Sequence, residues 1–475
     1  MARSRRRIIY LCQACGHESP RWSGQCPSCQ AWNTLVEVED APDRPSWLAR
    51  DTQGPQELTA VSQAAGQRLL LPGREFNRVL GGGIVPGSVT LLGGDPGIGK
   101  STLILQVGAE ATRLGPVLYV CGEESPQQVR LRADRLGIAG AGLLLLPETN
   151  LRVVLAALEE RRPSLVIVDS LQTMYVDEVP GAPGTVGQMR ESTLRLTQYA
   201  KARDVPVFLV GHVTKDGAIA GPRVVEHMVD VVLYLEGEAA STYRLLRSAK
   251  NRFGSTNEVG IFEMGEVGLV EVENPSLAFL AERPANAIGS AVVPMLEGTR
   301  PLLVEVQALT SPAVMGPPRR VATGVDFNRL LMLIAVLVQR AGLSLGNQDV
   351  IVNVVGGLRV QEPAADLAIA LAIASSARNT PVDPAVVAVG EVGLSGELRG
   401  VAQTERRLAE AAALGFRSAL VAPQRRGIRA ALPGLQIKEA STLREAIRLG
   451  LQTPSRRGEV SSPSVQPPTD AGQSG

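Results

Sequence analysis

The sequence predicts an α/β protein whose parallel sheets are covered by helices on both faces. From about residue 72 to 275, apolar runs alternate with segments of helical periodicity, and the runs span 88–92, 117–120, 165–169, 206–210 and 229–235. A second stretch, from about 285 to 450, repeats this pattern with apolar runs at 301–306, 350–355, 385–389 and 418–422. Helices in the second stretch are expected near 326–340, 363–377 and 404–414.

The composition indicates well-filled aliphatic cores and little net charge. Of 475 residues, 44% are hydrophobic but only 3% are aromatic, so Leu, Val, Ile and Ala must fill the cores. The net charge of +1 gives no bulk field for nucleic-acid or membrane binding, so any nucleic-acid site must be a local patch. No uncharged apolar run of about 18 residues and no signal-peptide core is present. We expect a cytoplasmic protein that does not bind membranes.

Four of the five cysteines lie within residues 8–38 as two C-x-x-C pairs, Cys12 with Cys15 and Cys26 with Cys29. Two such pairs set four thiolates tetrahedrally around Zn²⁺, at about 2.3 Å each. A segment this short cannot bury a core unaided, so the metal would supply its folding free energy. We expect a zinc ribbon. A redox-active cysteine pair is the alternative, and the absence of a thioredoxin-like sequence context around the cysteines disfavours it.

Composition shifts divide the chain into five parts. Residues 39–60 are rich in Pro, Asp and Gln and predict a linker, and residues 451–475 predict a disordered tail because they hold Ser, Pro, Gly and Gln without an aromatic residue. The expected parts are a metal-binding segment, the linker, two α/β domains and the tail, at 8–38, 39–60, 61–280, 285–450 and 451–475.

The residues from Gly94 to Ser101 fit the G-x-x-x-x-G-K-[ST] pattern at every fixed position. They follow the apolar run 89–92 and open a helical segment at Thr102, which is the context that a phosphate-binding loop requires. Lys100 is expected to reach the β- and γ-phosphates, and the Ser101 hydroxyl to hold Mg²⁺. The predicted ATP-binding residues are Gly94, Asp95, Pro96, Gly97, Ile98, Gly99, Lys100, Ser101 and Thr102.

Three further strand ends carry polar residues suited to ATP hydrolysis. Asp169 ends the run 165–169 and is expected to hold Mg²⁺ beside Ser101. Glu123 and Glu124 follow the run 117–121; carboxyl ends of parallel strands face the ligand, so one of the two is expected to orient the attacking water. The sequence does not say which, although Glu123 is the first choice. His212 follows the run 207–210 and is a candidate sensor of the γ-phosphate.

This order of parts resembles the RecA-like ATPases. The resemblance implies that loops near 172–188 and 214–222 line the pore of a ring or filament and contact single-stranded DNA. Cations that follow the DNA backbone and an aromatic residue that stacks on a base would then come from these loops and their flanks. The candidates are Lys215, Arg190, Arg223 and Tyr175.

Only five of the 48 basic residues are Lys, so each lysine invites a specific explanation. Lys201 and Lys438 lie in no motif and are expected at the surface. Lys250-Asn251-Arg252-Phe253-Gly254, by contrast, resembles the signature of the bacterial RadA (Sms) family. Two cations two residues apart after a strand point the same way and can act on a neighbouring subunit's γ-phosphate. Fingers of this type are worth roughly 10³–10⁵ in rate.

The resemblance to the RadA family covers about residues 8–450. It implies a DNA-dependent ATPase that assembles into a homo-oligomeric ring, expected to be a hexamer. Such a ring would move on single-stranded DNA and promote branch migration of recombination intermediates in DNA repair, alongside the RecA recombinase.

Residues 285–450 resemble the proteolytic domain of Lon, which uses a Ser nucleophile and a Lys base. Gly390–Arg399 is similar to the segment before the Lon lysine, and 362–366 to the segment of its serine. Ala364 takes the place of the serine, and Glu405 falls at the lysine position. With no lysine from 251 to 437, we expect an inactive scaffold. An ATP-dependent protease and a self-phosphorylating RecA-like switch are the two alternative functions.

Overall fold

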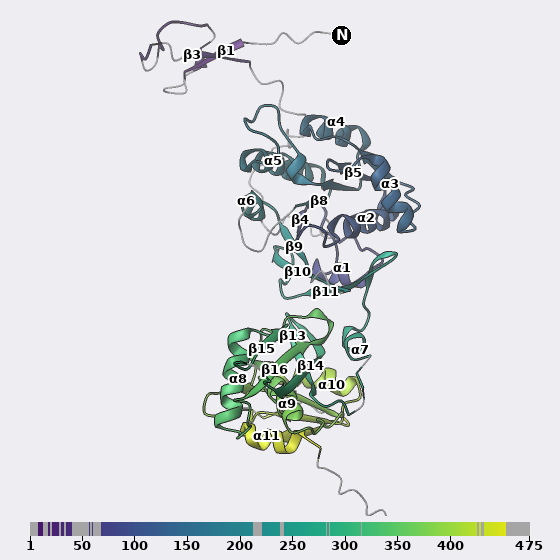
Figure 1. Ribbon diagram of the computed structural model, residues 1–475. Helices are drawn as coiled ribbons and strands as arrows, with labels where there is room; N and C mark the ends of the chain where they lie inside the picture. Colours follow the sequence, from purple (N-terminus) through teal and green to yellow (C-terminus); the bar gives the residue numbers. More distant parts are fainter. Residues whose placement is uncertain are drawn as a thin grey trace, which may run out of the picture.

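The computed structural model describes three sheets and a two-stranded ribbon (Figure 1). The predicted fold class, α/β with a parallel-sheet core, an N-terminal ribbon and a second α/β domain, is confirmed. The described residues are 8–12, 18–19, 21–27, 30–32, 35–39, 57, 59, 68–211, 221–237, 242–281, 283–284, 286–314, 316–424, 427–428 and 432–452.

The first large sheet has the strand order β12-β11-β10-β9-β4-β8-β7-β5-β6. The six strands from β9 to β6 in this order are parallel, and β10, β11 and β12 extend the sheet as an antiparallel meander. The strands are β4 (Val89–Gly93), β5 (Val117–Cys121), β6 (Leu143–Leu146), β7 (Leu165–Asp169), β8 (Val207–Val210), β9 (Val231–Glu236), β10 (Tyr243–Asn251), β11 (Val259–Gly265) and β12 (Gly268–Glu271).

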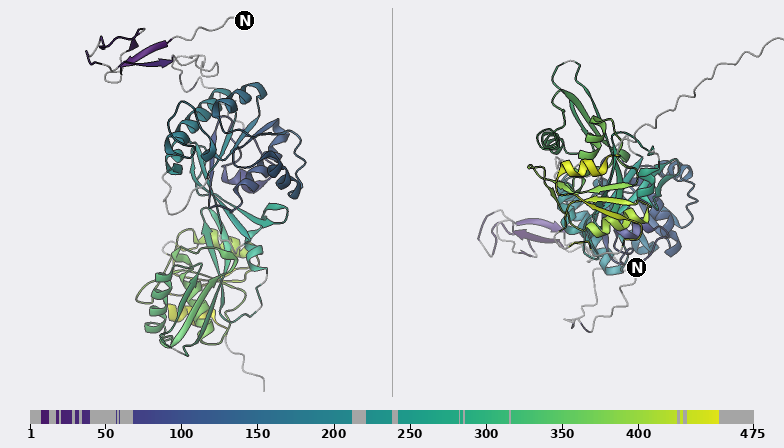
Figure 2. Two further views of the ribbon diagram at one scale, coloured as in Figure 1. Left: turned by 45° about the horizontal axis from the view of Figure 1, so that its top comes forward. Right: turned by 90° about the horizontal axis from the view of Figure 1, so that it is seen from below.

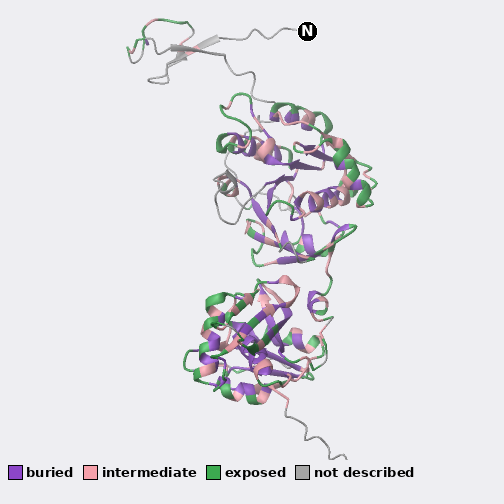
Figure 3. Ribbon diagram, in the orientation of Figure 1, coloured by how far each residue is buried: buried purple, intermediate pink, exposed green. Residues whose placement is uncertain are grey.

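Helices cover both faces of this sheet, so its central strands are buried along their whole length (Figure 3). One buried cluster joins α2 and α3 to one face, and another joins α4 and α5 to the other. Two-sided burial explains why these strands are continuous apolar runs and do not alternate with polar residues. The helices are α1 (Arg74–Val79), α2 (Lys100–Ala111), α3 (Pro126–Arg135), α4 (Leu151–Arg161), α5 (Val186–Arg203) and α6 (Gly221–Met228).

The second large sheet has the order β15-β16-β14-β13-β17-β20-β21. All four strands expected in this stretch are present, and β14 is longer than its apolar run because it pairs with both β13 and β16. The strands of this sheet are β13 (Ser290–Glu297), β14 (Arg300–Pro312), β15 (Arg320–Thr323), β16 (Gln348–Val354), β17 (Val386–Val389), β20 (Ser418–Val421) and β21 (Gln436–Glu439). The separate two-stranded ribbon consists of β18 (Glu391–Val392) and β19 (Leu398–Arg399).

The helix α9 is the centre of this second domain. Its residues from Asp366 to Ser375 are all buried, which fits a helix that is apolar around its whole circumference. The helices are α7 (Pro275–Leu280), α8 (Phe327–Gln339), α9 (Asp366–Ala377), α10 (Thr404–Ala413) and α11 (Leu443–Gly450).

The N-terminal segment forms a three-stranded antiparallel sheet in the order β2-β1-β3. Its strands are β1 (Ile8–Cys12), β2 (Glu18–Ser19) and β3 (Leu35–Glu39). A tight turn follows Cys26, whose N–H donates to Ala31 O over 3.0 Å and whose carbonyl accepts from Gln30 N–H over 2.9 Å. The segment has the short strands and tight turns expected of a metal ribbon.

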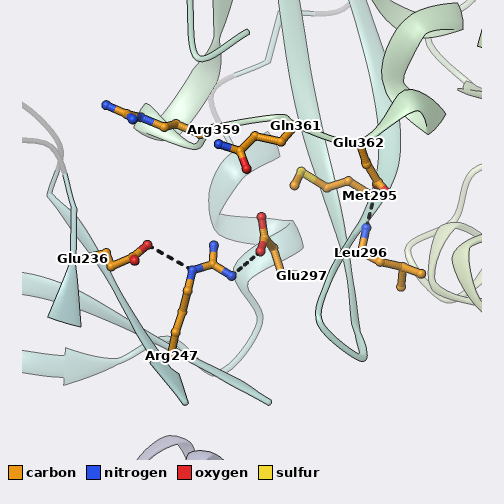
Figure 4. Close-up of a pocket in the computed structure, with 8 residues that line it drawn as sticks. All are labelled: Glu236, Arg247, Met295, Leu296, Glu297, Arg359, Gln361 and Glu362. Carbon is orange, nitrogen blue, oxygen red and sulfur yellow. Dashed lines mark hydrogen bonds and ion pairs between the residues drawn. The ribbon is translucent and has the colours of Figure 1, made fainter. Parts of the chain in front are cut away.

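The two α/β domains lie one beside the other (Figure 2), and the tip of the β13–β14 hairpin makes polar contacts with the first domain. Arg300 forms an ion pair with Glu75, which is buried in α1, and Thr299 N–H donates to Asn257 O over 2.8 Å. Arg247 of β10 joins Glu236 to Glu297 at 3.1 and 2.5 Å (Figure 4). These contacts make the hairpin tip the main polar link between the domains.

A cavity of about 550 Å³ lies beside this link. Arg247 pairs with Glu236 and Glu297, and Glu362 pairs with Arg407, so most of the charge on the cavity wall is neutralised. The lining residues are Glu236, Arg247, Met295, Leu296, Glu297, Arg359, Gln361 and Glu362 (Figure 4).

Gly298, at the hairpin tip, allows the close approach of the domains. It has φ of +62°, and a Cβ there would lie 1.7 Å from Asn257 O. We expect Gly298→Ala to lower the midpoint of urea unfolding more than Gly316→Ala. Gly316 has φ of +78° with nothing within 4 Å of a Cβ, so it reports only the conformational cost of about 1–2 kcal/mol. Equal shifts for the two variants would contradict this close packing.

Candidate nucleotide site

The loop from Gly94 to Gly99 connects the buried strand β4 to helix α2. Gly94, Gly97 and Gly99 have φ of +146°, +76° and +111°, a region that side chains with a Cβ rarely adopt. A Cβ on Gly94 would also lie 2.5 Å from Leu235 O, so the loop can pass next to β9 only as glycine. The backbone therefore curls into a cradle at the carboxyl edge of the sheet, as a phosphate site requires.

Lys100 begins helix α2 and its side chain lies inside this cradle. The residue is 4% exposed, and its ammonium donates to Gly94 O and Asp95 O, each over 2.8 Å. Burial lowers the pKa of Lys100, while Asp169, Glu123 and Asp95 act in the opposite direction. The carboxylates of two neighbouring strand ends therefore face the ammonium, and the residues present fit the phosphates of a nucleotide.

Asp169 ends strand β7 and is held by two hydroxyls. Tyr119 of β5 donates its hydroxyl proton to Asp169 Oδ2 over 2.6 Å. Burial raises the pKa of Asp169, and hydrogen bonds from Tyr119 and Ser101 lower it. Because a hydroxyl and a carboxylate meet here beside the cradle, the donor set fits the oxygen ligands that Mg²⁺ prefers.

The structure distinguishes Glu123 from Glu124. Ser170, the residue after Asp169, donates its hydroxyl proton to Glu123, which also lies close enough to Lys100 to affect the lysine pKa. Glu124 forms an ion pair with Arg132 of α3 instead. Glu123 thus faces the nucleotide cradle, whereas Glu124 is held toward the neighbouring helix.

The two cations of the 250–254 motif lie far from this cradle. In the pairing register, Lys250 is opposite Val232 and Asn251 opposite Val231, and these residues of β9 pair with Leu91 and Thr90 of β4. The motif is therefore level with the first half of β4, whereas the cradle follows its last residue. Gly94 of the cradle lies beside Leu235, which is roughly 10 Å along β9 from Val232, the residue opposite Lys250. Lys250 and Arg252 cannot serve their own subunit's cradle without moving.

Both cations bind the junction between α6 and β9. The Lys250 ammonium donates to the carbonyls of Glu226, His227 and Val229 over 2.9, 3.2 and 2.9 Å. Arg252 Nη1 lies 3.0 Å from Asp230 Oδ1, in a carboxylate that is 2% exposed. Burial, followed by the charge of Arg252, lowers the pKa of Lys250.

The other residues of the motif have packing roles. Asn251 donates to Leu80 O over 3.2 Å and accepts from Phe253 N–H over 2.9 Å. Phe253 packs against the core of the first sheet, and a Cβ on Gly254 would lie 3.1 Å from Gly81 Cα. The motif is thus anchored to the turn after α1 while its two cations reach the α6–β9 junction.

The candidate DNA-contacting residues are only partly described. Arg190 is exposed on α5. Tyr175 is half-buried; its N–H donates to Thr149 O over 3.0 Å, and its hydroxyl lies 3.4 Å from the Asn150 amide nitrogen. His212 and Lys215 lie outside the described residues, and for Arg223 only the backbone in α6 is described.

The cysteine site is described at two of its four positions. Cys26 is buried, Cys12 is described only as the last residue of β1, and Cys15 and Cys29 lie outside the described residues. Across the part of the chain that the structure describes, no group of three or more His, Cys, Asp or Glu side chains is placed to hold a metal ion. The described geometry therefore leaves the zinc prediction untested.

Four residues of the site were not predicted. Tyr119, Ser170 and Arg132 hold Asp169, Glu123 and Glu124, and Asp230 holds Arg252. Lys201, expected only at the surface, also pairs with Asp230 at 3.3 Å. A polar residue within or next to an apolar strand, such as Tyr119 or Asp230, was the one available signal, because burial obliges such a group to find a partner.

The fold and the site together define a RecA-like ATPase with two accessory domains. The family model "AAA domain" matches residues 40–218, "Rubredoxin metal binding domain" matches 10–37, and "Subunit ChlI of Mg-chelatase" matches 327–425. No helix in the described part of the chain is long and apolar enough to cross a membrane.

Relatives extend over nearly the whole chain. "DNA repair protein RadA" of Bacillus subtilis (strain 168) is 51% identical over 449 residues, covering 93% of this chain and 98% of the relative. The protein of the same name from Halalkalibacterium halodurans is 50% identical over 454 residues, covering 94% and 99%. The chain belongs to the RadA family of DNA repair proteins. Among solved structures, a KaiC-like protein from Pyrococcus horikoshii is 20% identical, covers 44% of this chain and 99% of that chain, and gives a TM-score of 0.37.

Tyr119→Phe tests the support of Asp169. Without the hydroxyl, a buried carboxylate loses a donor, and we expect the free energy of unfolding to fall by about 2 kcal/mol. Tyr199→Phe is the matched control, because the Tyr199 hydroxyl donates to the neutral Leu158 O over 3.3 Å and its loss should cost about 1 kcal/mol or less. Urea unfolding of both variants measures the difference, and equal losses would contradict the assigned support.

Proposed function

We propose that the chain is a DNA-dependent ATPase that works as a ring on single-stranded DNA and on branched recombination intermediates. The observation that supports it most strongly is the separation of Lys100, Asp169 and Glu123 from Lys250 and Arg252. The first three meet at the carboxyl edge of the sheet, and the last two lie toward its amino edge. A cation pair so placed can act on nucleotide only when a neighbouring subunit brings its own cradle to that edge.

Within one subunit, the chain's own residues bind the nucleotide and orient water. Lys100 exchanges its carbonyl partners for phosphate oxygens, and Ser101 and Asp169 hold Mg²⁺, which when bound neutralises phosphate charge. Glu123, held by Ser170, orients the attacking water at the carboxyl edge. Lys250 and Arg252 of the neighbour stabilise the charge that develops on the γ-phosphate.

The family assignment supports a role on DNA, since the relatives are named as DNA repair proteins. We assign DNA contacts to Lys215, Arg190, Arg223 and Tyr175, and the γ-phosphate sensor to His212. The ring is proposed to be a hexamer that promotes branch migration together with the RecA recombinase in the cytoplasm. Cys12, Cys15, Cys26 and Cys29 are assigned to Zn²⁺. The proposed domains are the zinc ribbon at 8–38, the linker at 39–60, the ATPase domain at 61–280, the C-terminal domain at 285–450 and the tail at 451–475.

The C-terminal domain is proposed as a scaffold without protease activity. Ala364 is 2% exposed and offers no nucleophile. Close to it, Arg407 of α10 binds Glu362 through two contacts of 2.6 Å and also donates to Pro294 O over 3.0 Å. This pair of a buried arginine and a half-buried glutamate fastens α10 and the segment before Ala364 to β13, which suits a structural role.

ATP hydrolysis measured with and without single-stranded DNA, together with particle size, tests the proposal. We expect DNA to raise the turnover, and active particles to be several times the mass of one chain. Turnover that does not respond to DNA, in a monomer, would contradict it. Casein degradation would favour the protease alternative, and labelled phosphate retained on the protein would favour the self-phosphorylating switch.

Glu123→Gln and Glu124→Gln form a matched pair that tests the water-orienting role. Glu123→Gln should lower the hydrolysis rate at least 10²-fold, the order expected for loss of a general base, with nucleotide affinity nearly unchanged. Glu124→Gln should change the rate much less, because Arg132 holds that side chain away from the cradle. A larger loss for Glu124→Gln would reverse the assignment.

A further inference from the structure

Lys250 has a role inside its own subunit that the motif does not suggest. Helix α6 is eight residues long and ends at Met228, where the last carbonyls of a helix have no partner within the helix. Three carbonyls at and after this end, those of Glu226, His227 and Val229, accept from the Lys250 ammonium. A cation at a helix C-terminus also interacts favourably with the helix dipole. Lys250 is therefore the C-terminal cap of α6.

The residue after this cap is a buried carboxylate that joins three elements. Asp230 accepts from Val89 N–H of β4 over 3.1 Å, and pairs with Lys201 of α5 and with Arg252. Its own N–H donates to Val89 O over 2.9 Å. The junction between α6 and β9 is thus fixed on one side to β4, whose other end leads into the phosphate loop. On its other side it is held by Lys250 and Arg252.

We propose that Lys250 has two alternative partners: the carbonyls at the end of α6 in its own subunit, and the phosphates of a nucleotide bound by the neighbouring subunit. One ammonium has three protons to donate, and the cap uses all three. Lys250 cannot keep this cap and also bind a phosphate fully. Engagement with the neighbour's nucleotide therefore uncaps α6, and the helix end loosens when a triphosphate is present next door.

Because of Arg252, the change of partners at Lys250 leaves the rest of the α6–β9 junction in place. In the structure the Arg252 side chain pairs with Asp230, and its backbone N–H donates to Asp230 O over 3.1 Å, a contact that stays when the side chain turns toward a neighbour's nucleotide. Lys201 offers Asp230 a second cation, so this buried carboxylate keeps a partner even when Arg252 turns outward. The junction is expected to stay folded after Lys250 leaves, and only the last turn of α6 becomes less protected.

Hydrogen exchange of the full chain, read on the peptide spanning residues 224–232, tests this inference. Without nucleotide or DNA, Lys250→Ala should exchange about tenfold faster there than wild type, because charge-assisted hydrogen bonds to three carbonyls are lost. Lys250→Gln keeps a neutral hydrogen-bond donor, so its exchange rate at this peptide should lie between those of wild type and Lys250→Ala. Lys438→Ala is the control, since it removes an equally rare lysine from β21 in the other domain and should leave this peptide unchanged. An unchanged rate in Lys250→Ala would overturn the cap.

The second arm adds a non-hydrolysable ATP analogue. Wild type should now exchange faster at this peptide, approaching Lys250→Ala, and Lys250→Ala should not respond. Lys100→Ala, which lacks the phosphate-loop cation, should keep the slow rate. If the peptide in wild type exchanges equally slowly with and without bound analogue, the proposal that Lys250 switches between two partners would be overturned.

The alternation rests on the proposed action of Lys250 across the subunit boundary, whereas the cap does not. The first arm contains no nucleotide, so its failure refutes the cap and leaves the proposed ATPase function untouched. Failure of DNA-stimulated turnover would refute that function and leave the cap intact.

Discussion

The two edges of one parallel sheet constrain the chemistry of this chain. All six parallel strands present their carboxyl ends on the same side, so the phosphate loop, Glu123 and Asp169 meet there. The antiparallel strand β10 returns toward the opposite edge and places Lys250 and Arg252 at the α6–β9 junction. A single subunit therefore holds its nucleotide-binding residues and its cation pair about one strand length apart. This separation is why an assembled form suits the site better than a monomer.

The second domain is attached to β10, the strand that contains Lys250 and leads directly into Arg252. Arg247, three residues before Lys250 on β10, binds Glu297 at the end of β13. Leu245, Val259 and Ile261 of the first sheet share a buried cluster with the core of the second. A displacement of the C-terminal domain would therefore act on β10 directly. This connection would give the proposed ring a physical route to the two cations that are proposed to act between subunits.

The sequence predicted what depends on local pattern. Strands buried on both faces are continuous apolar runs, so a strand such as 165–169 could be predicted directly. The phosphate loop from Gly94 to Ser101 could be predicted as well, because its glycines stand at fixed positions that the loop conformation requires. Strands β6, β12, β15 and β21 were not predicted because each is only four residues long. Strands β11 and β13 were also not predicted, since Gly260 and Glu263 interrupt the apolar run of β11 and Pro294 interrupts that of β13. The choice between Glu123 and Glu124 depended on Ser170 and Arg132, which lie 47 and 8 residues away in sequence. Tyr119 reaches Asp169 diagonally across β5 and β7, which only the strand register reveals.

The partners of Lys250 are backbone carbonyls. Every residue has a backbone carbonyl, so no sequence pattern indicates which of them Lys250 binds.

The central claim, that Lys250 acts on the nucleotide of a neighbour, is tested most directly by mixing two inactive variants. Lys100→Ala lacks the phosphate-loop cation but keeps Lys250, and Lys250→Ala has the reverse defect. Each alone should lack DNA-stimulated turnover. In randomly mixed rings, about a quarter of the sites pair an intact cradle with an intact neighbouring Lys250, so turnover should recover to about a quarter of wild type. Turnover in the mixture no higher than the average of the two separate variants would contradict the account.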